Sequence, residues 1–100
     1  MTRTAAKAPA RRTVNARVAA GEFEGWEATA HVDFPARILA DLQSGSLDRV
    51  LPALDRIVTE HNMPDEDGKV AETMADVVPY DGMLAVAKEL LEAMQSLPPR

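Results

Sequence analysis

Apolar and polar residues alternate along one stretch of the chain, between positions 26 and 34. The apolar members are Trp26, Ala28, Ala30, Val32 and Phe34. A period of two predicts a β-strand with one buried and one solvated face. Gly21 and Gly25 flank Phe23 and predict a turn before this strand, and an extended segment over residues 18–23 is expected to pair with it as a hairpin. His31 falls on the polar face, so we expect it to be exposed.

Helical spacing of apolar residues dominates the rest of the chain. The predicted helices cover residues 35–43, 47–61, 69–78 and 81–97. Pro35 suits the first turn of a helix, whereas Pro52 lies inside the second helix and predicts a kink or a later start. The sequence therefore predicts an α+β fold that is mainly α, with a short N-terminal strand or hairpin packed by about four helices.

Charge divides the chain into two unequal parts. Residues 1–17 contain five basic residues and no acidic one, while residues 18–100 contain six basic and sixteen acidic residues, a net charge of −10. Val14 is the only sizeable apolar residue of the basic part, which is too little to offset the entropy of ordering it. We therefore predict a disordered basic arm over residues 1–17 and a single small globular domain over residues 18–100.

Several classes of function are excluded or disfavoured by composition. The chain has no cysteine, so disulfides, cysteine zinc sites and thiol nucleophiles are excluded. No apolar run approaches the length of a membrane span, and the basic N-terminus is not followed by the apolar region of a secretory signal. We expect a cytoplasmic protein without a membrane partner, and the acidic body argues against nucleic acid as a partner.

Catalytic and metal-binding motifs are missing from the sequence. His31 and His61 are the only histidines, and no histidine motif or glycine-rich phosphate loop surrounds them. An EF-hand loop that started at Asp65 would need glycine at its sixth position, but Gly68 stands at the fourth. We therefore predict no enzyme activity, no catalytic residue, no metal and no cofactor.

Apolar residues in excess of what a small core needs indicate a protein-binding role. The residues predicted to contact a partner are Phe23, Trp26, Leu54, Ile57, Val58, Leu84, Leu90, Leu91 and Met94. The two aromatic residues are the largest groups available as anchors, and the aliphatic ones lie on the stripes of the second and fourth predicted helices. An ordinary core role is the alternative for Phe23 and Trp26.

Four segments between Phe23 and Leu97 carry a family resemblance. They read FEGWEATAHVDFP, GSLDRVLPALDRIV, HNMPDEDGK and VVPYDGMLAVAKELLEAM. They correspond, in this order, to a strand entering a helix, an aliphatic helix, an acidic turn and a final helix introduced by proline. In these four segments the chain resembles the small tail assembly chaperones of long-tailed bacteriophages, especially those of actinobacterial hosts.

The resemblance implies a non-enzymatic role in virion assembly within the host cell cytoplasm. Such proteins bind the long helical tape-measure protein and keep it soluble while tail-tube subunits assemble around it, and many of their genes also yield a longer, frameshifted product. The expected partners are thus the tape-measure protein first and a tail-tube subunit second, with self-association also open. Two alternatives remain: a structural virion or head–tail connector component, and a small acidic, antitoxin-like regulator that uses the basic arm on nucleic acid.

Overall fold

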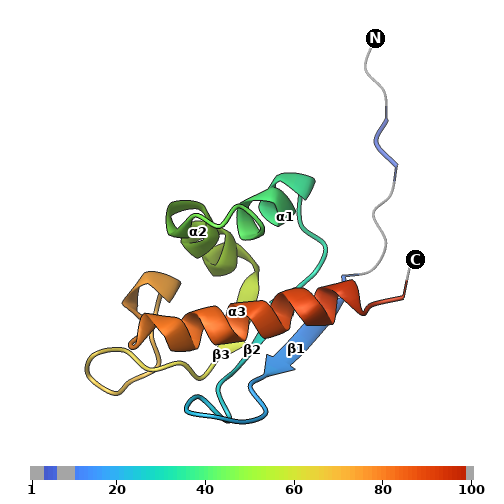
Figure 1. Cartoon of the computed structure of the whole chain (residues 1–100). Helices are drawn as coiled ribbons and strands as arrows, with labels where there is room; N and C mark the ends of the chain where they lie inside the picture. Colours follow the sequence, from blue (N-terminus) through green and yellow to red (C-terminus); the bar gives the residue numbers. More distant parts are fainter. Residues whose placement is uncertain (1–3, 7–10, 99–100) are drawn as a thin grey trace.

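A three-stranded antiparallel sheet and three α-helices make up the computed structural model, which describes residues 4–6 and 11–98 (Figure 1). In chain order the elements are β1 (Thr13–Arg17), β2 (Glu27–His31), α1 (Ala36–Leu42), α2 (Leu47–Ile57), β3 (Val58–His61), the 3₁₀ turn η1 (Met74–Asp76) and α3 (Tyr80–Gln95). The prediction of a mainly helical fold, with about four helices on a short strand or hairpin, is therefore wrong.

The sheet has the strand order β1-β2-β3, with β2 in the centre. In β1, Val14 and Ala16 are buried, whereas Thr13, Asn15 and Arg17 are exposed. This alternation gives the sheet one dry face and one polar face, as a half-buried antiparallel sheet requires. At one end of the first strand pair, Arg17 in β1 is the register partner of Glu27 in β2.

The N-terminal strand overturns part of the predicted arm. Residues 13–17 were expected to be disordered, but they form β1 and pair with β2; residues 1–3 and 7–10 of the predicted arm lie outside the described residues. The hairpin uses β1 in place of residues 18–23, and the residues after Val18 form its turn. Gly21 and Gly25, with φ of 95° and 89°, adopt the left-handed conformation that glycine tolerates best.

Of the four predicted helices, one is shorter than expected and another is absent. The helix predicted over residues 47–61 starts at Leu47, so Pro52 does not delay it, but it ends at Ile57 and its last four residues form β3. The helix predicted over residues 69–78 is replaced by a loop that contains only η1. In contrast, α1 and α3 confirm the first and last predicted helices within a few residues.

A side chain of α2 and one directly after β3 hold the irregular segments in place. The Asp55 carboxylate on α2 accepts the Met74 backbone N–H at 2.8 Å, which satisfies the start of η1. Asn62 links the end of β3 to the hairpin, because its Oδ1 accepts the Glu27 N–H and its Nδ2 donates to the Gly25 carbonyl, both at 2.9 Å. The asparagine of the acidic turn motif therefore has a structural role.

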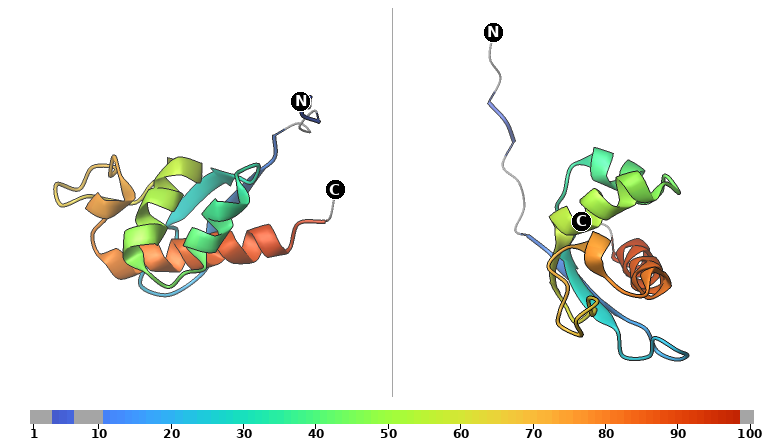
Figure 2. Two further views of the ribbon diagram at one scale, coloured as in Figure 1. Left: turned by 90° about the horizontal axis from the view of Figure 1, so that it is seen from above. Right: turned by 90° about the vertical axis from the view of Figure 1, so that its left-hand side faces the viewer.

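All three α-helices lie on the dry face of the sheet (Figure 2). The face beneath α3 is lined by alanines, with Ala16 in β1 and Ala28 and Ala30 in β2 all buried. Because alanine adds only one carbon to the backbone, α3 can pack closely on β1 and β2. The side chains that α3 sends into this layer are Met83, Val86 and Leu90.

One aromatic contact fixes the start of α3. Trp26 stacks at a tilt on Phe23, with 4.9 Å between the ring centroids, and its indole lies against Gly82. A Cβ atom at position 82 would lie 2.2 Å from Trp26 Cζ3, inside contact distance. Gly82 is therefore present, at a cost in helix propensity, to admit the indole.

We expect Gly82→Ala to destabilise the protein by about 1–3 kcal/mol, since the new methyl group overpacks the contact with Trp26. In the Trp26→Phe background, which lacks the outer indole ring, the same change should be nearly neutral or stabilising, as alanine normally is in a helix. Urea unfolding of the four proteins, followed by far-UV circular dichroism, measures this coupling. Equal effects of Gly82→Ala in both backgrounds would show that the indole is not the obstacle.

Candidate functional site

An apolar groove runs between α3 and the α1–α2 pair. One end is a hollow of about 390 Å³ beside the start of α2, lined by Leu47, Val50 and Leu84 among others. The other end is a hollow of about 490 Å³ beside α1, lined by Phe34, Leu39 and Leu97 among others. Leu91 and Gln95 line both hollows. The two hollows thus adjoin, and we call them together the apolar groove.

The groove exposes large aliphatic side chains. Leu39 is 40% exposed, Leu47 is 44% exposed and Leu84 is 38% exposed. Single exposed leucines are common, but leucines from three different helices that line one groove form a patch typical of an interaction site. When a partner covers these side chains, their apolar surface is removed from water, which favours binding by about 25 cal/mol per Å² of buried apolar area.

The groove follows from the helical repeat of α3. Met83, Val86 and Leu90 point into the layer over the sheet. Leu84 and Leu91, seven residues apart, share a different side of the helix, with the half-buried Ala87 between them. The apolar stripe of α3 is therefore wider than the side of the helix that contacts the sheet, and the remaining apolar side chains of the stripe line the groove.

The predicted partner-binding residues separate into three groups. Leu54, Ile57 and Leu90 are buried in the core, so they present no surface to a partner in this fold. Phe23, Trp26 and Val58 are half-buried against the core and line neither hollow of the groove. Leu84, Leu91 and Met94 line the groove, which brings together three of the predicted residues from the final helix.

Sequence reasoning missed the wall of the groove opposite α3. Leu39 and Leu47 belong to α1 and α2, and Phe34 precedes α1. Leu39 directly follows the buried Ile38. An apolar residue just outside the core-facing side of a short helix indicates an exposed apolar contact, so Leu39 could have been identified from the sequence. Nothing local shows that Phe34 and Leu39 face Leu97, which lies far along the chain.

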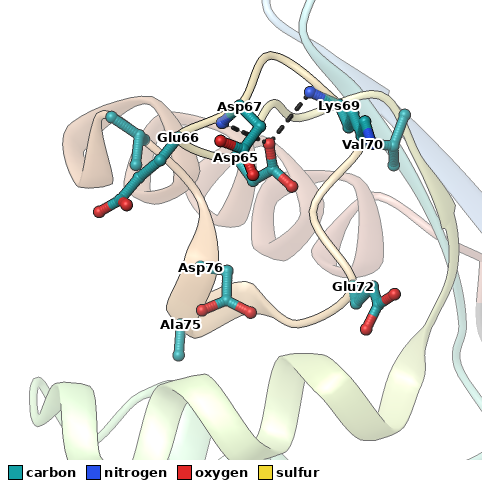
Figure 3. Close-up of a pocket in the computed structure, with 9 residues that line it drawn as sticks. Asp65, Glu66, Asp67, Lys69, Val70, Glu72, Ala75 and Asp76 are labelled. Atoms are coloured by element: carbon teal, nitrogen blue, oxygen red, sulfur yellow. Dashed lines mark hydrogen bonds between the residues drawn. The ribbon is translucent and has the colours of Figure 1, made fainter.

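A third hollow, of about 420 Å³, lies apart from the groove and is lined by acidic side chains of the loop after β3 (Figure 3). The Asp65 carboxylate accepts the backbone N–H groups of Asp67 at 2.8 Å and Lys69 at 3.0 Å, and Asp76 accepts the Thr73 hydroxyl at 3.1 Å. These bonds shape the loop. Within residues 4–6 and 11–98, no three histidine or carboxylate side chains are grouped to hold a metal ion.

Both histidines bond to the backbone. His31 Nε2 donates to the Arg56 carbonyl at the end of α2, at 3.3 Å, and the residue is half-buried, so the prediction that it is exposed is wrong. His61 Nδ1 accepts the Met63 N–H at 3.1 Å. His61 lies in β3 and not at the end of a helix. Their contacts give both rings a structural role in joining elements of the fold.

Comparisons with models of known protein families, with curated proteins and with solved structures find no match to this chain. No helix in the described part of the chain is long and apolar enough to cross a membrane.

We expect Asp65→Ala to lower the free energy of unfolding by about 1–2 kcal/mol, because two backbone N–H groups lose their acceptor. Asp67→Ala is the matched control, since it removes the same charge from the same loop but leaves the Asp65 carboxylate and both of its backbone donors in place. Thermal unfolding with and without millimolar calcium measures both effects, and calcium should leave the wild-type midpoint unchanged. A clear rise of that midpoint with calcium would contradict a purely structural loop.

Proposed function

We propose that this protein is a non-enzymatic tail assembly chaperone of a bacteriophage, which binds helical segments of the tape-measure protein in the apolar groove and keeps that protein soluble during assembly of the tail tube. The observation that carries the proposal is the groove itself, with exposed leucines contributed by α1, α2 and α3. The resemblance of four sequence segments to this family supports the choice of partner.

The dimensions of the groove fit an amphipathic helix. Between Leu84 and Gln95, α3 rises by about 16 Å, which corresponds to about three helical turns. A partner helix of that length presents apolar residues at i, i+3 or i+4, and i+7, and helix-in-groove recognition uses this spacing. A long helical protein that has not yet been enclosed exposes many such segments.

The net charge of the folded part suits a chaperone that must not associate with itself. Residues 11–98 contain eight basic and sixteen acidic residues, and this net charge of −8 opposes self-association of a protein with an exposed apolar groove. The regulator alternative relies on the basic arm, but two of its five cations belong to the folded body: Arg17 lies in β1 and Arg12 lines the groove. This placement favours the chaperone over the regulator.

Leu84→Asp and Leu39→Asp should each reduce the yield of soluble tape-measure protein at least fivefold, because a charged group in the groove opposes docking of an apolar helix. The measurement is co-expression with the tape-measure protein of the same phage, followed by the ratio of soluble to total tape-measure protein. Val70→Asp is the matched control, because Val70 is 57% exposed on the loop after β3, outside the groove.

Circular dichroism of each purified variant must first match that of the wild type, which both groove positions allow because they are partly exposed. Leu90→Asp would be uninformative, since Leu90 is 2% exposed and the change would disrupt the core. Full chaperone activity in folded Leu84→Asp and Leu39→Asp proteins would refute the groove as the binding surface.

Deletion of residues 1–10 should leave the yield of soluble tape-measure protein unchanged, because the groove and β1 lie outside this segment. A longer deletion through Arg17 is not equivalent, since it removes β1 and with it one side of the core. The same co-expression assay measures the effect. Loss of activity on the short deletion, in a protein that still folds, would favour the regulator, in which the arm makes the essential contact.

A further inference from the structure

Arg12 stands at one end of the apolar groove. It lines the hollow that also contains Phe34, Leu39, Met94 and Leu97. Its backbone is part of the sheet, because the Arg12 carbonyl accepts the Val32 N–H at 2.9 Å. The backbone of Arg12 is therefore fixed at the edge of the sheet, although the residue directly precedes β1.

The guanidinium of Arg12 lacks an anionic partner among the described residues. Its Nη1 donates to the Pro98 carbonyl at 3.3 Å, a long contact to a neutral acceptor. Its Nε is buried and has no hydrogen-bond partner. The neighbouring Asp33 carboxylate accepts the Arg12 backbone N–H. A guanidinium whose only acceptor is a neutral carbonyl is poorly compensated beside apolar walls, so an anionic ligand that reaches its accessible N–H groups gains binding energy.

A carboxylate is the group that best fits this position. A guanidinium binds a carboxylate through charge-assisted and often bidentate hydrogen bonds, and these strengthen beside apolar walls that exclude water. At the opposite end of the groove the charges are balanced, because Lys88 and Glu92 line the same hollow. Among the described residues that line the hollow at the other end, Arg12 is the only charged one.

We propose that Arg12 selects a partner helix that carries a glutamate or aspartate at the end of its apolar stripe, and that this ion pair sets the direction in which the helix lies in the groove. The inference rests on the proposed function, of which it specifies the binding motif. Arg12 is a specificity-determining residue, while the leucines of the groove supply most of the affinity.

Two synthetic amphipathic peptides test the proposal. Each has 16 residues, with leucines at i, i+4, i+7 and i+11; one carries a glutamate one turn after the last leucine, and the other a glutamine there. By isothermal titration, the wild-type protein should bind the glutamate peptide roughly five- to tenfold more tightly. Arg12→Gln should remove this preference without weakening the glutamine peptide. Arg11→Gln, an exposed neighbour of the same charge, should retain it.

A second measurement does not depend on a substitution at Arg12. In ¹⁵N-labelled wild-type protein, the Nε–Hε resonance of Arg12 should shift with the glutamate peptide and not with the glutamine peptide. A spin label at the peptide end away from the glutamate should broaden signals of Leu47 and Leu84 and spare Leu97.

The proposal is overturned if the wild type binds both peptides equally, if it binds neither, or if Arg12→Gln weakens both alike, in which case Arg12 only holds the Pro98 carbonyl. The co-expression assay separates this failure from failure of the proposed function. A tape-measure protein kept soluble without any glutamate preference leaves the chaperone proposal standing, and a glutamate preference without a soluble tape-measure protein leaves the binding motif standing.

Discussion

Close packing of α3 on the alanine-lined face of the hairpin is the interaction on which the rest of the structure depends. Ala16, Ala28 and Ala30 leave room above β1 and β2, and Met83, Val86 and Leu90 fill it from the helix. A three-stranded sheet of such short strands is marginal by itself and needs a helix to cover its apolar face. This contact joins the beginning of the described body to its last helix, so the fold closes only when both ends are present.

The position of α3 also explains why an apolar groove remains. α3 packs against β1 and β2, whereas the α1–α2 pair is tied to the sheet through the direct passage of α2 into β3. Both lie on the same face of the sheet (Figure 2). Leucine side chains that line the groove between them are only partly covered. A body of fewer than 90 residues buries a smaller fraction of its surface than a large domain does. The exposed leucines are what this geometry leaves for a partner.

Polar side chains show a corresponding division of roles. Asp55, Asn62 and Asp65 accept backbone N–H groups and shape the irregular segments around β3. Other carboxylates of the loop after β3 stay at the surface, where their negative charge opposes association between molecules. Among the cations of the N-terminal segment, Arg17 faces Glu27 across the sheet, while the Arg12 guanidinium has only a carbonyl oxygen as its partner in the described structure. The amino-acid type alone therefore does not reveal which charged residues are structural.

Periodicity by itself predicted the central strand and the first and last helices, because each depends on a local pattern of residues. The groove residues of α3, Leu84, Leu91 and Met94, were also accessible in this way as members of one long stripe. Only the tertiary structure decided where β1 and β3 form and which residues make the wall of the groove opposite α3. Val14 and Ala16 are too few and too small to signal a strand until α3 covers them, and Val58–His61 continues a helical spacing until β2 offers hydrogen bonds. Leu54, Ile57 and Leu90 have the same local pattern as groove residues, and only the packing of α2 and α3 against the sheet places them in the core.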